Sequence, residues 1–262
     1  MKIDFFKYQG TGNDFVILDN RNQQFDSITS QQVKFLCDRK FGVGADGLLM
    51  LQLKAGFDFE MTYFNSDGNK STMCGNGGRC LVRFAHRLGI HKYTYKFIAA
   101  DGEHEAEIDN QGEIRLKMQD VKNVQEHGNY SVLNTGSPHY VKFVSDLAEL
   151  NVNQTGRDIR NSKLYKENGI NVNFVENIGE NLIFVRTYER GVETETLSCG
   201  TGVTAAAIIA AHNHKGFNRV EVKTSGGKLA VEYNKIDEHN FENVWLCGKA
   251  EFIFKGEIDV SD

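Results

Sequence analysis

Two cysteines, Cys74 and Cys199, are the residues of this 262-residue chain whose type and setting point most directly to chemistry. Each is followed at once by closely spaced glycines, in MCGNGGRC and in LSCGTGVTA, and each turn leads into a run with helical spacing. A cysteine at a helix N-terminus lies beside backbone N–H groups and the positive end of the helix dipole. That position lowers the pKa of a thiol from about 8.5 into a range of roughly 3.5 to 7.5. Both cysteines are therefore predicted to ionise near neutral pH.

The glycines after each thiol suggest that an anion binds there. Glycine lets a ligand approach the backbone closely, and the N–H groups at a helix N-terminus suit a carboxylate or a phosphate. Two such thiols facing each other across a cleft would hold one anionic group between them. Stereoinversion at carbon needs a base on one face and an acid on the other, and a thiolate with a thiol supplies both. The pattern predicts a two-base site that binds a carboxylate while the α-carbon loses and regains a proton.

The other cysteines need a different interpretation. A lone cysteine is usually a small buried hydrophobe, which is how we interpret Cys37, Cys80 and Cys247. Cys74 and Cys80 lack the spacing of a zinc knuckle, and no His or Cys set completes a metal site. The odd number and irregular spacing of the cysteines favour free thiols in a reducing compartment. A single activated thiol would instead suggest a nucleophile with a histidine base.

An internal repeat links the two thiols. They are 125 positions apart, and the same offset places Thr62-Tyr63 on Thr187-Tyr188. Near the start of each half the offset is 124, which places TGN at 11–13 on TGS at 135–137. One half of the chain therefore looks like a copy of the other.

The repeated unit predicts the same order of elements twice. Each half has an alternating strand, a polar turn with the thiol, a helix and then a strand-turn-strand pair. The second helix is apolar almost all round, which predicts that it is buried. The expected strands are residues 57–64 and 181–189. The expected central helices are residues 80–89 and 203–212, and the expected hairpins are residues 94–108 and 219–233.

These elements predict an α/β (α+β) fold of two pseudo-symmetric domains. With 26 glycines, one proline and many short strands, each domain should be a mostly antiparallel sheet or barrel wrapped around its central helix. We place the first domain at residues 1–121 and the second at 122–250. The strand at 251–262 has no counterpart in the first half, so we expect it to return and complete the first domain.

Composition argues against several classes of partner. The net charge is −5 and the basic residues are scattered, so nothing predicts nucleic-acid binding. Charges at Lys2, Asp4 and Lys7 interrupt any signal-peptide core, which favours a cytoplasmic protein. The apolar run at 205–211 is far shorter than the roughly 20 residues that span a bilayer, so no membrane segment is expected.

Several long motifs, in order along the chain, resemble the diaminopimelate epimerase family. The resemblance implies cofactor-independent interconversion of LL- and meso-diaminopimelate, in lysine and peptidoglycan precursor biosynthesis. It also implies two pseudo-symmetric α/β domains with the site between them, a homodimer, and no metal or pyridoxal phosphate. The motifs are GTGNDFV at 10–16, FGVGADGLL at 41–49, FNSDG at 64–68, MCGNGGRC at 73–80, GSPHYV at 136–141, NVNF at 171–174 and YERGVETETLSCGTG at 188–202.

The resemblance also implies roles for individual residues. Cys74 and Cys199 would be the acid/base pair, and His139 and Glu189 would tune their pKa values. Amide groups at Gly75-Asn76 and Gly200-Thr201 would hold the reacting carboxylate. The residues implied in contacts with substrate are Asn13, Asn65, Asn171, Glu189 and Arg190.

One pair of these residues breaks the internal symmetry. Arg190 falls on Asn65 at the 125 offset, where the copies should differ if one end of the substrate reacts and the other is recognised. A guanidinium suits a remote carboxylate because it donates two parallel hydrogen bonds. The repeat would thus supply the chemistry, and the difference between its copies the specificity.

The chain departs from the family pattern at two positions. Ser137 stands where family members commonly have an asparagine that contacts substrate, so its role is open. Gly47 stands where some relatives have glutamine, and we assign it no role. The simpler alternatives are a satisfied loop histidine for His139, a solvated ion pair for Glu189 and Arg190, and turn or cap positions for the asparagines.

Other functions were weighed against this one. GVGADG at 42–47 fits a dinucleotide-binding pattern, but LLMLQL follows it as a strand rather than a helix. Proline or hydroxyproline racemases and phenazine-type isomerases share the superfamily, but their substrates lack a distal amino-acid end for Arg190 and Asn171. A duplicated binding protein without activity would have no reason to place a thiol before the helix in both copies.

Overall fold

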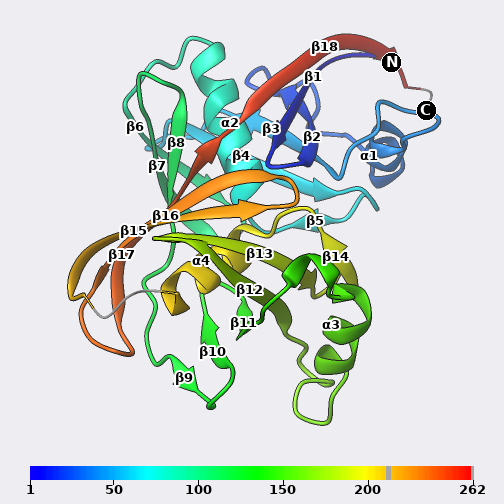
Figure 1. Cartoon of the computed structure of the whole chain (residues 1–262). Coiled ribbons are helices and arrows are strands. Elements are labelled where there is room, and N and C mark those ends of the chain that lie inside the picture. Colours follow the sequence, from blue (N-terminus) through cyan, green and yellow to red (C-terminus); the bar gives the residue numbers. More distant parts are fainter. Residues whose placement is uncertain (211–213, 261–262) are drawn as a thin grey trace. The chain divides into compact units, whose positions relative to one another are not determined.

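The structure is a computed structural model that describes residues 1–210 and 214–260 (Figure 1). Its helices are α1 Ser30–Cys37, α2 Gly75–Arg87, η1 Leu147–Glu149 (3-10), α3 Val152–Arg160 and α4 Gly200–Ile209. Its strands are β1 Lys2–Gly10, β2 Asn13–Asp19, β3 Gly47–Gln52, β4 Phe59–Asn65, β5 Lys70–Ser71, β6 Thr94–Ala99, β7 Gly102–Ile108, β8 Glu113–Lys117, β9 Gln125–Glu126, β10 Ser131–Asn134, β11 Pro138–Phe143, β12 Asn171–Gly179, β13 Leu182–Glu189, β14 Thr194–Thr196, β15 Gly216–Thr224, β16 Gly227–Lys235, β17 Phe241–Lys249 and β18 Glu251–Asp259.

The chain forms two compact units, which are described separately. Unit 1 holds Met1–Leu116 together with the C-terminal segment from Gly248, and unit 2 holds Lys117–Cys247. In unit 1, β18 pairs antiparallel with β1 from Lys2↔Asp259 to Gln9↔Glu251, so the first and last strands lie side by side (Figure 1). The last strand of the sequence therefore completes the sheet that the first strand begins.

Both units repeat one order of elements. Unit 1 runs β2, α1, β3, β4, β5, α2, β6, β7, and unit 2 runs β11, α3, β12, β13, β14, α4, β15, β16. The pairs β2–β3 and β4–β6 are parallel in unit 1, and so are β11–β12 and β13–β15 in unit 2. The remaining pairs described within each unit are antiparallel. The predicted fold class, a mostly antiparallel sheet around a central helix in each half, is confirmed.

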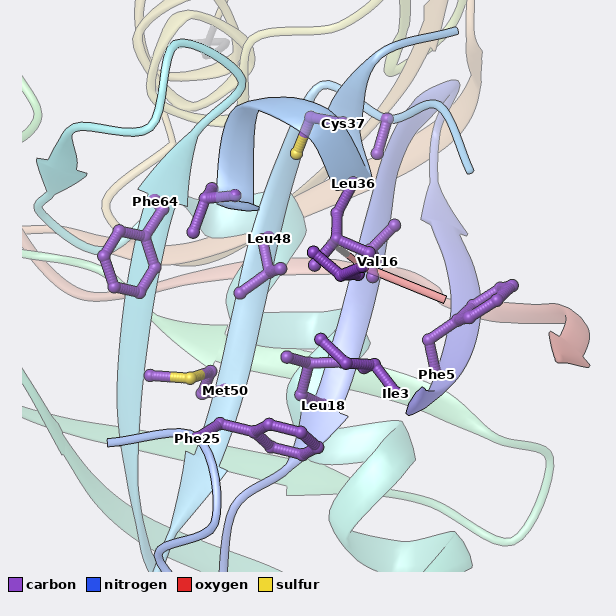
Figure 2. Packing of buried hydrophobic residues seen from close by; sticks show 13 residues of the cluster. Ile3, Phe5, Val16, Leu18, Phe25, Leu36, Cys37, Leu48, Met50 and Phe64 are labelled. Carbon is purple, nitrogen blue, oxygen red and sulfur yellow. The ribbon is translucent and has the colours of Figure 1, made fainter. Parts of the chain in front are cut away.

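In unit 1 the alternation of side chains along β2, β3 and β4 gives the sheet two buried faces. One face packs against α1 through a cluster that includes Val16, Leu18, Leu48 and Met50 (Figure 2). The opposite face receives α2, where a side chain at Gly77 would lie 3.4 Å from Leu49 and Met61. The first turn of α2 therefore packs directly on this face of the sheet.

Unit 2 is layered in the same way. Tyr140, Val172, Phe174 and Tyr188 form the core beside η1 and α3. Their neighbours along each strand point to the other face of the sheet, and α4 contacts that sheet at Gly202, close to Asn173 and Thr187. Eight residues of α4 are buried, so the burial predicted from its apolar sequence is confirmed.

The structure also contains helices that the sequence analysis did not predict. α1 follows a capping box in which Thr29 and Gln32 bond each other's backbone N–H groups, and the side chain of Asn151 caps α3. The central helices begin before the predicted spans, directly after each cysteine. Glycine disfavours a helix interior by about 1 kcal/mol, but packing against the sheet outweighs that cost in the first turn of α2.

We expect Gly156→Ala to destabilise unit 2. A methyl group at this position in α3 would lie 2.4 Å from Cβ of Tyr188, so the helix would have to move off the sheet. Overpacking costs about 1–3 kcal/mol, against a gain of up to about 1 kcal/mol in helix propensity. Thermal unfolding should show a lower Tm. The control is Gly78→Ala in α2, where the methyl group has 3.4 Å of clearance, and an equal loss there would contradict this explanation.

Candidate functional site

The two thiols predicted to be reactive occupy the same position on their central helices. Cys74 is the N-cap of α2 and Cys199 is the N-cap of α4, each with extended backbone angles. Among the described residues, neither cysteine side chain makes a capping hydrogen bond to its own helix. The predicted placement of both thiols at helix N-termini is confirmed. Each thiol therefore lies where first-turn N–H groups and the helix dipole favour negative charge.

In unit 1, three of the predicted site residues meet at the start of α2. Oδ1 of Asn13 lies 3.6 Å from Sγ of Cys74, and the Asn76 side-chain amide donates to the same oxygen at 3.4 Å. Asn13 is the first residue of β2, which lies beside β3 on the sheet that α2 covers. The structure therefore brings Asn13 and Asn76 to Cys74, and we call these three residues half-site 1.

Asp46 sets the orientation of Asn13. Its Oδ2 accepts a hydrogen bond from the amide nitrogen of Asn13 at 2.7 Å and from the backbone N–H of Asp14 at 3.2 Å. Because the amide nitrogen faces a carboxylate, the amide oxygen of Asn13 must face Cys74. The sequence analysis gave Asp46 no role, although it lies in the GVGADG segment.

A charged network supports this arrangement from behind. Arg39 donates to both Asp14 and Asp46 at 2.7 Å, and buried Lys7 forms an ion pair with Asp14 at 2.7 Å. Burial alone would raise the pKa of Asp14, but the hydrogen bonds from Arg39 and Lys7 outweigh it and lower that pKa to about 2. Asp14 therefore stays ionised well below neutral pH and keeps the network intact.

Arg79 holds the first turn of α2 from inside unit 1. It is fully buried, and its guanidinium donates to Thr11 at 3.0 Å, to the Asn76 side chain at 2.9 Å and to the Gly75 carbonyl at 3.3 Å. These bonds join the β1–β2 turn to the residues that follow Cys74. Nothing in the spacing of MCGNGGRC predicted this role for Arg79.

Asn65 and Gly47 lie at the end of the same sheet. They are opposite each other in the β3–β4 register, at the last residue of β4 and the first of β3. A side chain at Gly47 would lie 2.5 Å from the Tyr63 ring and 2.6 Å from the Phe64 carbonyl oxygen. Glycine is therefore required at position 47 by this backbone.

In unit 2, Cys199 lies beside Thr201 in the first turn of α4. Its Sγ is 3.5 Å from the Thr201 hydroxyl, and the Thr201 carbonyl accepts a hydrogen bond from the Thr135 hydroxyl at 2.8 Å. Cys199 is 8% exposed. We call Cys199, Gly200 and Thr201 half-site 2.

Each half-site has its own set of contacts, and the two sets involve residues at equivalent positions of the internal repeat. Thr11 contacts the Asn76 side chain in unit 1, and Thr135 contacts Thr201 in unit 2. Deeper in the helices, Arg79 donates to the carbonyl of Gly75, and Thr204 donates to the carbonyl of Gly200 at 3.0 Å. Each pair differs by 124 or 125 positions, so the duplication extends to the bonds that fix the first turn of each helix.

Asn171, Ser137 and Arg190 form a second cluster in unit 2. The Asn171 amide donates to the Ser137 hydroxyl at 2.9 Å and accepts from the Arg190 backbone N–H at 2.8 Å. The Arg190 guanidinium donates to Ser137 at 3.2 Å and to the Asn168 carbonyl at 3.0 Å. Ser137, which departs from the family pattern, is thus a hydrogen-bond partner of both predicted substrate-binding residues.

His139 and Glu189 occupy different environments. His139 is fully buried, and burial together with the nearby charge of Arg190 lowers its pKa to about 3, so it is neutral at pH 7. Its Nδ1 lies 3.1 Å from the Asn173 amide nitrogen. Glu189 is half-buried at the end of β13 and accepts from the Thr196 hydroxyl at 2.8 Å.

The remaining cysteines are core residues, as predicted. Cys37, Cys80 and Cys247 are at most 3% exposed, and burial raises the pKa of Cys37 to about 12 and also raises that of Cys80. In the part of the chain that the structure describes, no group of three or more His, Cys, Asp or Glu residues could hold a metal ion. Within the same residues, no helix has both the length and the apolar character needed to cross a membrane.

Comparison with known proteins decides the family. The family model described as diaminopimelate epimerase matches residues 5–124 and 131–253. The chain belongs to the diaminopimelate epimerase family. A diaminopimelate epimerase of Flavobacterium psychrophilum is 50% identical over 254 residues, covering 97% of this chain and 99% of the relative. That of Chlorobaculum tepidum is 41% identical, covering 95% of this chain and 98% of the relative.

Solved structures of more distant proteins share the fold. A Bacillus anthracis phenazine biosynthesis protein of the PhzF family superposes with a TM-score of 0.75 at 14% identity, covering 99% of this chain and all of that one. A hydroxyproline epimerase from Agrobacterium vitis gives a TM-score of 0.70 at 11% identity, covering all of this chain and 93% of that one. At these identities the likeness shows the fold of this diaminopimelate epimerase family member and nothing about its substrate.

We expect Asp46→Asn to lower activity more than stability. An amide has one acceptor oxygen, so it cannot accept from both Asn13 and Arg39 without turning its own N–H₂ group toward a donor. Asn13 would then lose its fixed orientation beside Cys74. Misplacing a substrate-positioning group by about 1 Å can cost on the order of 100-fold in rate. We expect kcat/KM to fall by about 10- to 100-fold in an assay of diaminopimelate epimerisation.

Asp26→Asn is the matched control for this substitution. Asp26 also accepts a hydrogen bond from an asparagine amide in unit 1, that of Asn20 at 2.8 Å, and Asn20 is not a residue of half-site 1. The control should lose a similar amount of stability and keep its activity. Equal loss of activity in the two variants would show that Asp46 acts through the stability of unit 1 alone.

Proposed function

We propose that this protein is a cofactor-independent amino-acid epimerase that interconverts LL- and meso-diaminopimelate with two cysteines as acid and base. The observation that carries the proposal is the repeated placement of a thiol at the N-cap of the central helix in each unit. The family supplies the substrate, because the relatives that match over nearly the whole chain are named diaminopimelate epimerases. The reaction belongs to lysine and peptidoglycan precursor biosynthesis.

The chemistry needs one thiol at each face of the α-carbon. One cysteine, as thiolate, removes the α-proton and becomes a thiol, and the electron pair spreads onto the substrate carboxylate. The other cysteine, as thiol, donates its proton to the opposite face and becomes a thiolate. The reverse reaction exchanges the two roles, so no proton is gained or lost overall.

Stabilising the deprotonated substrate is the most demanding part of this reaction. Amides at Gly75-Asn76 and Gly200-Thr201 lie in the first turns of α2 and α4, where fixed N–H groups stabilise a carboxylate as its charge grows. Arg79 and the Thr135–Thr201 bond hold those turns in place, so little reorganisation is needed during the reaction.

We assign the distal amino-acid end of the substrate to the cluster in unit 2. Arg190 offers a guanidinium already oriented by Ser137 and the Asn168 carbonyl, and Asn171 fixes the backbone on which it stands. Asn13, Asn65 and Glu189 complete the proposed set of substrate contacts. Glu189 and His139 adjust the thiol pKa values, and neither exchanges a proton with substrate.

We further propose that the protein is a cytoplasmic homodimer. Its proposed binding partner is the small-molecule substrate, and neither nucleic acid nor a membrane is proposed as a partner. The odd number and irregular spacing of the five cysteines favour a reducing compartment. Strand β18 exposes Ile253 and Phe254 by 49% and 44%, which suits an apolar contact with a second copy. Light scattering should then give twice the 29.5 kDa of one chain.

Hydrogen exchange in heavy water tests the proposed reaction. The reduced protein, with no cofactor added, should introduce deuterium at the α-carbon of LL-diaminopimelate and produce the meso isomer, observed by proton NMR and chiral chromatography. Proline, hydroxyproline and lysine are the comparison substrates. Exchange into proline in preference to diaminopimelate would favour a racemase, and no exchange into any amino acid would favour a binding protein.

A further inference from the structure

We propose that Asn173 is a positioning residue that fixes His139 as a neutral imidazole protonated on Nε2, so that His139 serves half-site 2 as a hydrogen-bond donor. The inference rests on the proposed function for its meaning, but its geometry stands by itself. Asn173 is fully buried in β12 and bonds to both neighbouring strands. It belongs to the NVNF segment, in which only Asn171 was given a role.

The orientation of the Asn173 amide follows from its neighbours. Its nitrogen donates to the backbone carbonyl of Tyr140 at 3.0 Å, and its oxygen accepts from the Thr187 hydroxyl at 2.9 Å. A carbonyl oxygen can only accept, so the opposite orientation would set two oxygens against each other at the Tyr140 position. The amide nitrogen must therefore lie on the side of β11, which carries His139.

The same nitrogen determines the tautomer of His139. It lies 3.1 Å from Nδ1 of the imidazole, and its second proton is available for that contact. A donor in this position requires Nδ1 to be an acceptor, since a proton on Nδ1 would meet the amide proton. The single proton of the neutral ring is then on Nε2.

The charge state of His139 agrees with this assignment. Burial is the main reason why its pKa is lowered to about 3, and the charge of Arg190 contributes in the same direction. The imidazole therefore stays neutral throughout the range in which an enzyme works. It cannot act as a fixed cation beside a thiolate, and with Nδ1 engaged it has no free acceptor to act as a base.

What remains is the Nε2 proton, a buried donor without a hydrogen-bond partner among the described residues. An unsatisfied buried donor costs about 1–3 kcal/mol, so a native structure keeps one for a reason. An N–H group stabilises an anion that approaches it, and the reaction creates anions on sulfur and on the substrate carboxylate. The geometry thus gives His139 the role of a neutral donor.

Asn173 is also close to the helix that Cys199 begins. A side chain at Gly202, the third residue of α4, would lie 2.3 Å from Oδ1 of Asn173 and 3.3 Å from the Thr187 hydroxyl. The first turn of α4 therefore rests on the amide that orients His139. This contact places the pair of Asn173 and His139 between the sheet of unit 2 and the first turn of α4, which carries half-site 2.

The test is the tautomer of His139, measured by nitrogen NMR on full-length protein labelled with ¹⁵N histidine. The His139→Gln variant identifies its signals. We expect the wild type to show the Nε2–H tautomer, unchanged between pH 5 and pH 8. An Nδ1–H tautomer, or a ring that becomes protonated near pH 6.5, would overturn the proposal. This measurement needs no variant of Asn173.

Asn173→Asp tests the cause. A carboxylate at this position accepts hydrogen bonds, so it should draw a proton to Nδ1 and produce the Nδ1–H tautomer or the imidazolium. The matched control is Asn177→Asp, the same change at an exposed position of the same strand, which should leave the His139 signals unchanged. A folded Asn173→Asp variant that keeps the wild-type tautomer would show that Asn173 does not set it.

Measuring the epimerase activity together with the His139 tautomer distinguishes a failure of this proposal from a failure of the proposed function. If the epimerase reaction is present, Asn173→Asp should slow it about tenfold or more and add, between pH 5 and pH 8, a titration of His139 to the pH dependence that the two thiols give the wild type. If no amino acid undergoes exchange but the Nε2–H tautomer is seen, the proposed function fails and the positioning role of Asn173 stands. The reverse result would reject the positioning role alone.

Discussion

Cys74→Ala and Cys199→Ala are each expected to abolish net epimerisation of diaminopimelate. Inversion needs a base on one face and an acid on the other, so a single remaining thiol cannot complete it. General acid–base groups contribute about 10²- to 10⁴-fold each, and we expect at least a 1,000-fold lower rate for each variant. The measurement is conversion of LL- to meso-diaminopimelate under reducing conditions, followed by chiral chromatography.

Exchange of the α-proton for deuterium, without inversion, can be measured separately in the two variants. The thiol that remains in each variant can still remove a proton from the face that it contacts and return a deuteron to the same face. Residual exchange, where present, should therefore favour one epimer in Cys74→Ala and the other in Cys199→Ala. The same preference in both variants would contradict a division of the two faces between the two thiols.

Cys80→Ala is the control for loss of a thiol as such. Cys80 lies in the same helix as Cys74 but is fully buried, and burial raises its pKa, so it is not expected to ionise. The variant should lose some stability and keep its catalytic rate. Substantial inversion by either single-thiol variant would rule out the two-base mechanism.

The sequence was sufficient to predict the placement of both thiols, because that placement depends on a local pattern that occurs twice. Cysteine, glycines and a helical run identify a helix N-terminus in each half. LLMLQL after GVGADG was likewise interpreted as a strand, and β3 occupies Gly47–Gln52.

The residues that orient the site were missed because their partners are distant in sequence. The hydrogen bond between Asp46 and Asn13 joins residues 33 positions apart in the sequence, and that between Asn173 and His139 joins residues 34 positions apart. Arg79 follows the glycines in MCGNGGRC and was assigned no role, yet it is fully buried and bonds Thr11, 68 positions away. Such polar contacts depend on how strands and helices are placed side by side, and no spacing in the sequence encodes that.

The two departures from the family pattern show the same limit. Ser137 appeared to have lost a contact, but the structure gives its hydroxyl bonds to both Asn171 and Arg190. Gly47 appeared neutral, but the Tyr63 ring and the Phe64 carbonyl leave no space for a side chain. In each case the neighbouring strand, rather than the residue type, determines what the position can do.

Arg190→Gln is expected to weaken binding of diaminopimelate with little effect on the chemical step. We assign Arg190 to the distal carboxylate, which does not change during the reaction, so its loss should raise KM and leave kcat nearly unchanged. A hydrogen bond to a charged group contributes about 1.5–3 kcal/mol, which corresponds to about a 10- to 150-fold higher KM. The control is Arg186→Gln on β13, the strand that ends directly before Arg190. Arg186 pairs with Glu195 at 2.7 Å, so its loss should lower stability without changing KM.

The choice of substrate gives a second test of Arg190. Lysine has the amino acid that reacts but lacks the distal carboxylate, so the wild type should exchange its α-proton far more slowly than that of diaminopimelate. If Arg190 binds that carboxylate, Arg190→Gln should slow exchange of diaminopimelate and leave the slow exchange of lysine unchanged, because no partner is lost. Equal slowing of both substrates would place Arg190 at the reacting end, or would show that it acts through the structure around Ser137 and Asn171. The comparison therefore separates recognition of the distal end from support of the site.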